Sequence, residues 1–82
     1  GKALGQHDWE GFCKFVMDAR SGELLGGHLV GPEVTELLPE LGVTRTLEGT
    51  VEDIAHTVHA HPTLSEVLHE TALVTLGRGV HI

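Results

Sequence analysis

Two stretches decide the fold of this chain, GFCKFVMD at residues 11–18 and LLGGHLV at residues 24–30. The first alternates so that its odd-numbered positions are the more uniformly apolar, which is the pattern of a half-buried β-strand. The second is a mostly apolar run, and the glycine-containing connection at residues 19–23 has the length of a hairpin turn. We therefore predict an antiparallel hairpin from about residue 11 to residue 30. The side chains expected to face the core are Cys13, Phe15 and Met17.

Three helical segments are expected after the hairpin. In the first, Pro32 suits the first helical turn, and Pro39 should kink or interrupt the helix. The second begins at Thr50, with Asp53 three residues later, and the third begins at Thr63, where TLSE matches a capping box. The apolar faces predicted from helical spacing are Val34, Leu37, Leu38 and Leu41, then Val51, Ile54, Ala55 and Val58, then Leu64, Leu68 and Ala72. Strands followed by helices, and not alternating with them, are typical of the α+β class.

The length of 82 residues allows one small domain or part of one. A two-stranded sheet is barely stable alone, so further strands are expected from an upstream segment or from a partner. Cys13 is the sole cysteine, which excludes an internal disulfide and a thiolate metal cluster. Residue 1 is Gly and not Met, so we expect the chain to begin inside a longer protein, or after processing or a cloning scar. We predict that residues 1–82 are a single partial domain in which the antiparallel sheet packs with C-terminal helices.

The charge of the chain excludes two classes of partner. The formal net charge is −7, and the five Lys and Arg residues are scattered. A nucleic-acid binder needs a basic stripe, which is missing, and an anionic membrane surface would repel the chain. No apolar run approaches the roughly 20 residues that span a bilayer, and no basic-then-apolar leader opens the sequence. Together with the lone cysteine, these features predict a cytoplasmic protein that binds neither nucleic acid nor membrane.

The stretch that carries chemistry is HTVHAHPTLSE, residues 56–66. Histidine is the side chain whose unperturbed charge change falls near neutral pH. Pro62 disfavours helical backbone at His61, so the ring should project at the entrance of the third helix. Glu66 lies one turn into that helix, from where its carboxylate can turn back toward the imidazole. A carboxylate bonded to one ring nitrogen fixes the tautomer and stabilises the imidazolium, which makes His61 and Glu66 the candidate acid/base pair.

Each of these residues also has a plainer explanation. Glu66 is the N3 residue of the capping box on Thr63, and His61 can be an ordinary surface or interface histidine. His56 and His59 are expected to be exposed or to lie in an interface. A zinc site built from the three histidines is a weaker alternative, because further ligands at a clear spacing are missing. The residues alone leave these alternatives open.

Five stretches of the chain resemble the dihydrolipoamide dehydrogenases, within the pyridine nucleotide–disulfide oxidoreductases. HAHPTLSE resembles the active-site segment of that family, and its Leu and Ser after HPT favour the lipoamide branch over the glutathione branch, whose version runs more like HPTSAEE. HAHPTLSE is residues 59–66. The other stretches resemble a G-R-A start (residues 1–3), an E-G-F-V-K strand (residues 10–14), a G-x-H-I-V-G-P turn (residues 26–33) and the helix before the histidines (residues 50–55).

The resemblance implies a fold position and a function. Residues 1–82 would be the C-terminal dimerisation domain of a homodimer, with His61 reaching into the partner subunit's active site as the acid/base group in dithiol–disulfide exchange. Glu66 would orient that histidine, and Pro62 would follow a cis peptide bond. The full-length protein would carry FAD and NAD in upstream domains and would be an oxidoreductase. It would serve a 2-oxo acid dehydrogenase complex beside a lipoyl-bearing acyltransferase.

Several features depart from the family pattern. Residues 1–82 contain no G-x-G-x-x-G turn and no cysteine pair, so we expect no cofactor-binding residues in them and no activity from the isolated chain. Pro39 and Gly42 interrupt a helix that usually runs uninterrupted. Cys13 stands where the family commonly has a β-branched residue, and it is interpreted as a small core hydrophobe. The alternative function is a non-catalytic homodimerisation module, which the upstream sequence would distinguish from the enzyme.

Overall fold

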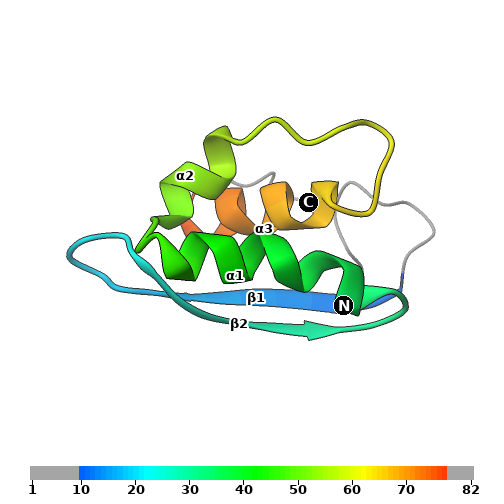
Figure 1. Ribbon diagram of the computed structural model, residues 1–82, viewed down its shortest axis with the longest axis horizontal. Coiled ribbons are helices and arrows are strands. Elements are labelled where there is room, and N and C mark those ends of the chain that lie inside the picture. Colours follow the sequence, from blue (N-terminus) through cyan, green and yellow to red (C-terminus); the bar gives the residue numbers. More distant parts are fainter. Residues whose placement is uncertain (1–9, 78–82) are drawn as a thin grey trace.

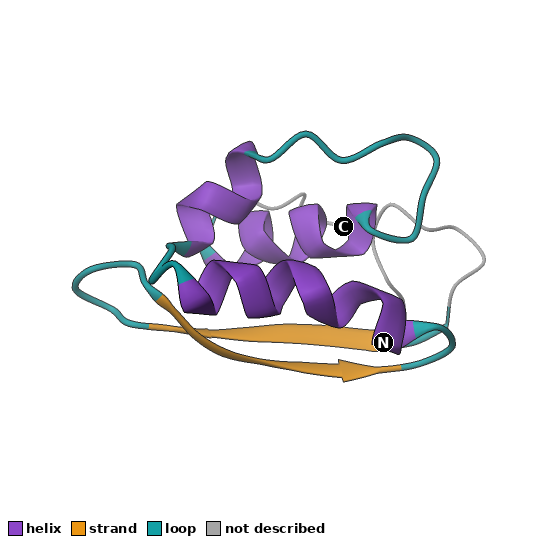
Figure 2. Ribbon diagram, in the orientation of Figure 1, coloured by secondary structure: helices purple, strands orange, loops and turns teal. Residues whose placement is uncertain are grey.

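The computed structural model describes residues 10–77, so the resemblance at residues 1–3 lies outside the described residues. Figure 1 shows α1 and α3 on the same side of a two-stranded sheet, and Figure 2 shows the same separation of strands from helices. The predicted α+β class is confirmed. No helix within residues 10–77 combines the length and the apolar composition needed to cross a bilayer. The elements are β1 (Phe12–Met17), β2 (Leu24–Val30), a 3₁₀ helix (Val34–Leu37), α1 (Leu38–Thr46), α2 (Val51–His56) and α3 (Glu66–Thr75).

The predicted hairpin is confirmed. β1 pairs with β2 in antiparallel register, with Phe15 opposite Gly27. The turn is closed by the Asp18 carboxylate, whose Oδ1 accepts hydrogen bonds from two backbone N–H groups at 2.8 and 2.9 Å. Gly27 lets α1 approach the sheet, because a Cβ at this position would lie 3.0 Å from Cδ1 of Leu41. The hairpin thus presents one apolar face, and α1 packs against β2 while α3 packs against β1.

The core lies between that face and the helices. Phe15 is buried, and Cys13 and Met17 pack against the same cluster in half-buried positions, as the alternation predicted. The other strand face carries exposed apolar side chains, among them Phe12 and Val16. Apolar burial stabilises the domain in proportion to the area removed from water. The buried core consists of Phe15, Leu24, Leu37, Leu41, Val51, Ile54, Ala55, Leu68 and Ala72.

The first helical segment is divided near Pro39, which was predicted to kink or interrupt it. A 3₁₀ turn ends at Leu37, and Pro39 stands in the first turn of α1 directly after it. The first backbone N–H groups of an α-helix have no partner inside the helix, so proline is tolerated there. Leu37 and Leu41 are buried as predicted, one helical turn apart. Leu38 was predicted on the same face and is half exposed, because it lies about 100° around the helix from Leu37.

The second helix begins as predicted and ends earlier. Thr50 is the N-cap of α2, and its side chain and that of Asp53 make the two reciprocal hydrogen bonds of a capping box. The predicted inward face is confirmed for three of its residues, which are buried in the core. Val58 was predicted on that face and is wrong, since it is 93% exposed. The helix stops before it, because Thr57 adopts an extended backbone with φ −70° and ψ 137°.

The capping box gives α2 a stability that depends on pH. The backbone N–H of Thr50, 2.8 Å from Oδ2, lowers the pKa of the Asp53 carboxyl, and the Thr50 hydroxyl adds to the effect. A lowered folded-state pKa means that the unfolded chain binds more protons in the titration range, so the stabilisation is present above about pH 4 and is lost as pH falls through the folded value. We expect Asp53→Asn to remove this acid-dependent part.

Hydrogen exchange of the α2 backbone amides measures the effect of Asp53→Asn. The unsubstituted protein should lose protection as the pH is lowered from 6 to 3, and the variant should begin with lower protection and change less over the same interval (about the range in which aspartate titrates). Equal slopes in the two proteins would contradict the assignment of this titration to Asp53.

Candidate active site

The candidate site is on the non-helical segment that joins α2 to α3, residues 57–65, which forms a loop on the side of the helices away from the sheet (Figure 1). Thr57 fastens its start, since its hydroxyl donates to the carbonyl of Asp53 at 2.8 Å. The peptide bond between His61 and Pro62 is cis, in agreement with the family pattern. Around this bond the Thr63 hydroxyl donates to the carbonyl of Ala60 at 2.6 Å, which closes a turn with His61 at its tip.

The structure brings His61 and Glu66 together as the spacing predicted. Nδ1 of His61 lies 2.6 Å from Oε1 of Glu66. The His61 side chain is 79% exposed, whereas that of Glu66 is 18% exposed. A carboxylate only accepts hydrogen bonds, so the ring donates from Nδ1 and, when neutral, carries its lone pair on Nε2. The imidazole is thus held in one tautomer and remains open to solvent.

Glu66 serves two partners with its two oxygens. Oε1 faces the imidazole, and Oε2 accepts a hydrogen bond from the backbone N–H of Thr63 at 3.2 Å. The second contact is the carboxylate half of the predicted capping box. The helix itself begins later than predicted, at Glu66 with Ser65 as its N-cap, because residues 61–65 form bends and turns around the cis bond. The capping and orienting explanations of Glu66 are therefore compatible.

This arrangement can perform acid/base chemistry. A general base must present an unprotonated atom within hydrogen-bond reach of the proton it takes, and an exposed Nε2 meets that requirement. Glu66 keeps the ring from rotating, because Oε2 is in turn held by the Thr63 backbone. His61 and Glu66 can transfer a proton, but in that role they form no bond to carbon or sulfur. The groups that react must therefore come from a substrate that binds beside Nε2 of His61.

The other two histidines pair with different carboxylates. His56 is exposed, in agreement with its prediction, and its Nε2 lies 3.1 Å from Oε2 of Glu52. His59 was predicted to be exposed or in an interface, and the exposed alternative is wrong. Its side chain is 5% exposed within this chain, and its Nε2 lies 2.6 Å from Oε2 of Glu40 on α1. Sequence reasoning missed Glu40 because no local spacing joins two residues that are nineteen positions apart.

The weaker zinc alternative finds no support in these positions. The three histidines turn toward three separate glutamates. Within residues 10–77, no three His, Cys, Asp or Glu side chains are gathered in a way that could hold a metal ion.

Cys13 fits its interpretation as a small core hydrophobe. It is half-buried on β1 and packs against the core cluster. Burial raises the pKa of the Cys13 thiol, and a hydrogen bond with Thr71 offsets the shift in part. Since the thiolate is the nucleophilic form of cysteine, a raised pKa lowers the fraction of this form at neutral pH.

The described residues do not fit a flavin or a nicotinamide. A dinucleotide cradle needs a glycine-rich turn between a strand and the N-terminus of a helix, where backbone N–H groups meet the pyrophosphate. Gly26 and Gly27 lie inside β2 instead, paired with β1. Within residues 10–77 the chain offers an imidazole and its carboxylate, and no glycine-rich turn of that kind lies among them.

Comparison with known proteins identifies the family. Residues 1–72 match the model of the pyridine nucleotide-disulphide oxidoreductase dimerisation domain. The chain is 52% identical over 81 residues to the dihydrolipoyl dehydrogenase of Zymomonas mobilis and 48% identical over 81 residues to dihydrolipoyl dehydrogenase 2 of Haloarcula marismortui. It is 55% identical over 69 residues, 84% of the chain, to the dihydrolipoyl dehydrogenase of Mycobacterium tuberculosis. The two 81-residue matches cover 99% of this chain and 17% of each relative, and the Mycobacterium match covers 15% of that relative. The chain belongs to the pyridine nucleotide-disulphide oxidoreductase family, as a dimerisation domain of the dihydrolipoyl dehydrogenase type.

Proposed function

We propose that residues 1–82 assemble a homodimeric dihydrolipoyl dehydrogenase and supply the acid/base histidine to the active site of the partner subunit. The observation that carries the proposal is the 2.6 Å contact between Nδ1 of His61 and Oε1 of Glu66, on a ring that is 79% exposed. Among the three histidines of residues 56–61, only His61 combines an exposed ring with a short contact to a carboxylate that is itself largely buried. The side of the ring away from Glu66 is therefore accessible to a substrate or to another chain.

The proposed step is a proton transfer that starts dithiol–disulfide exchange. Nε2 of His61 accepts the proton of one dihydrolipoyl thiol, and the resulting thiolate attacks a disulfide sulfur, which releases the other sulfur as a thiolate. The second substrate thiol then loses its proton and attacks the substrate sulfur of this mixed disulfide, which breaks the bond between substrate and protein and releases the second protein sulfur. The substrate leaves as a cyclic disulfide, and its two protons end on the two reduced protein sulfurs, one of them returned by Nε2 of His61. Glu66 holds Nδ1–H throughout, which keeps Nε2 as the proton-accepting atom.

The remaining parts of the enzyme are proposed to lie outside these residues. Upstream domains of the same protein would hold FAD, NAD and the redox cysteine pair, because residues 10–77 fit none of them. The substrate would arrive on the lipoyl group of an acyltransferase in a 2-oxo acid dehydrogenase complex, in the cytoplasm. The isolated 82-residue chain would accordingly have no dehydrogenase activity. The exposed apolar side chains of the outer sheet face, Phe12 and Val16 among them, support assembly with further chain or with a second copy.

Subunit complementation tests whether His61 acts across the dimer. Residues 1–82 would replace the matching 81 residues of the Zymomonas mobilis enzyme to give a chimera. One chimeric subunit would carry His61→Ala, and the other would carry serines in place of its redox cysteines. Each homodimer lacks one of the two groups at both sites. A heterodimer isolated by two affinity tags would join the intact disulfide of one subunit to His61 of the other at one site.

The heterodimer is expected to recover up to about half of the activity of the unsubstituted chimera, since one of its two symmetry-related sites is complete. A heterodimer as inactive as its parents would place the histidine in its own subunit and contradict the proposal. Full activity in the His61→Ala homodimer would instead favour a non-catalytic dimerisation module.

A further inference from the structure

We propose that His59 is a positioning residue that fixes the loop of His61 against the helices, an inference that rests on the proposed function of His61. In this assignment His59 never meets the substrate. It acts through the backbone of residues 59–61, and its hydrogen bond to Glu40 is the anchor.

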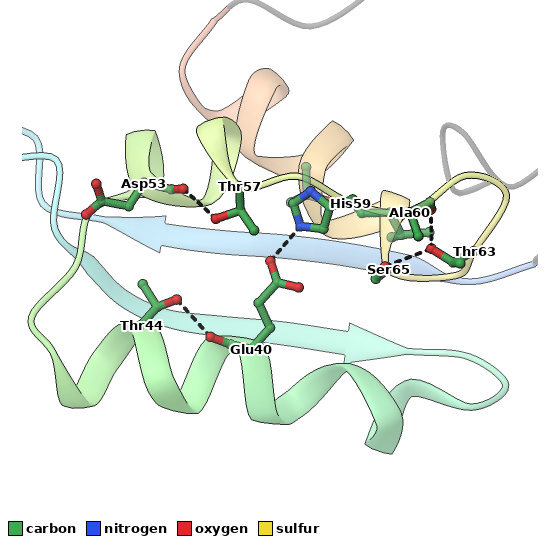
Figure 3. A network of polar contacts seen from close by, with 10 residues as sticks. Glu40, Thr44, Asp53, Thr57, His59, Ala60, Thr63 and Ser65 are labelled. Atoms are coloured by element: carbon green, nitrogen blue, oxygen red, sulfur yellow. Dashed lines mark hydrogen bonds and ion pairs between the residues drawn. The ribbon is translucent and has the colours of Figure 1, made fainter.

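The anchor joins two segments that are distant in sequence. Nε2 of His59 donates to Oε2 of Glu40 at 2.6 Å, with the His59 side chain 5% exposed and that of Glu40 25% exposed. Figure 3 shows the His59 ring pointing from the loop toward Glu40, which rises from α1. A short hydrogen bond to a charged group, largely shielded from water, is stronger than one at the surface. The contact therefore ties the loop to α1.

A second contact ties the same ring to α3. The ring centroids of His59 and His69 are 5.5 Å apart, with the planes tilted by 48°. His59 is thereby fixed between α1 and α3, two residues before His61. The hydrogen bond from the Thr63 hydroxyl to the Ala60 carbonyl closes the loop beyond the anchor. Few backbone torsions separate the anchored ring from the exposed one, so the position of the first constrains the position of the second.

The free-energy cost of burying the His59 ring indicates that the residue positions the loop and does not mainly stabilise the fold. Nδ1 of His59 and Nδ1 of His69 are both buried and lack a hydrogen-bond partner among the described residues. A buried polar atom left unpaired costs about 1–3 kcal/mol. Leucine at position 59 would fill similar space without that cost, and replacing a buried polar pair by apolar side chains is often neutral for folding. A residue kept only to stabilise the core would not need an imidazole here.

The test compares turnover with stability in the chimera. His59→Leu combined with Glu40→Met is expected to lower kcat roughly 10- to 100-fold, because small misplacements of a catalytic group have effects of that size. KM for dihydrolipoamide and the thermal midpoint of the dimer should change little. His59→Gln keeps an N–H donor that can reach Glu40, and it should recover most of kcat. The matched control is His56→Leu in the neighbouring exposed pair, with kcat expected within about twofold.

A background lacking His61 separates positioning from general support. His61→Ala alone measures the proposed function, and adding His59→Leu to it should cause no further loss, since the residue acts only through the imidazole. The same additional loss in both backgrounds would overturn the positioning role and leave the proposed function intact. An unchanged kcat in His59→Leu would also overturn it. Should His59→Leu fail to assemble, low kcat in His59→Gln with normal assembly would overturn the hydrogen-bond anchor, and recovered kcat would support it.

Discussion

His61→Ala in the chimera is expected to lower turnover with dihydrolipoamide by roughly 10²–10⁴-fold, which is the usual contribution of a positioned acid/base group. The loss should appear in kcat as well as in kcat/KM, because the imidazole acts on the proton in the transition state and makes little difference to substrate binding. Bound flavin, measured by its visible absorption, should stay at the level of the unsubstituted chimera. The fraction of dimer, measured by sedimentation, should also equal that of the unsubstituted chimera.

Glu66→Ala gives the companion result. It should reduce kcat less than His61→Ala does, because the imidazole remains and loses only its fixed tautomer and orientation. Residues that act as a unit have non-additive effects, so the double variant should be no slower than His61→Ala alone. If the fold-loss of kcat in the double variant equals the product of the two single fold-losses, Glu66 acts independently of His61. Its hydrogen bond from the backbone N–H of Thr63 would then be the contact that matters.

A second large effect is expected in the core. Leu68 on α3 is fully buried, and Leu68→Ala should lower the free energy of unfolding by about 2–5 kcal/mol, the sum of lost burial and of the cavity left behind. Free energies of native domains total about 5–15 kcal/mol, so this is a large share. Glu66 is the first residue of the same helix, α3. Loosening α3 should therefore separate the Glu66 carboxylate from the His61 imidazole.

Val74→Ala is the matched control for Leu68→Ala, since it removes a β-branched side chain from the same helix at a site that is 51% exposed. It should change the unfolding free energy by less than about 0.5 kcal/mol, as surface substitutions generally do. Native-state hydrogen exchange of the α3 amides in the dimer measures the free energy of local opening in both variants. Similar losses in the two variants would contradict the assignment of α3 as a core helix that packs through Leu68.

The parts of the fold that could be predicted from the sequence are those set by near neighbours. Alternation along β1 predicted that Phe15 faces the core, and the Thr50 and Asp53 pair predicted the start of α2. Both depend on contacts within a few residues. Val58 was misplaced, because periodicity alone gives no sign of where a helix ends. Thr57 ends α2 through its backbone torsions and its hydroxyl contact with the Asp53 carbonyl.

The same distinction holds in the candidate site. His61 and Glu66 are five positions apart, so proline at 62 and the helix beyond it were enough to predict that they meet. Glu40 and His59 meet only because the loop folds back over α1. That return depends on how α1, α3 and the sheet pack as a whole. A pattern in one segment carries no information about it, so the sequence did not predict that the His59 side chain is buried against Glu40.

The loop that carries His61 and the outer face of the sheet can accept substitutions independently of each other. The loop of residues 57–65 and the outer face of the sheet lie on opposite sides of the helical layer (Figure 1). Substitutions at Phe12 or Val16 on the outer face can therefore retune which surface the sheet recognises without reshaping the loop. Conversely, the loop can be altered without exposing the strands. A domain divided in this way can acquire a new binding partner while the contact between His61 and Glu66 stays the same.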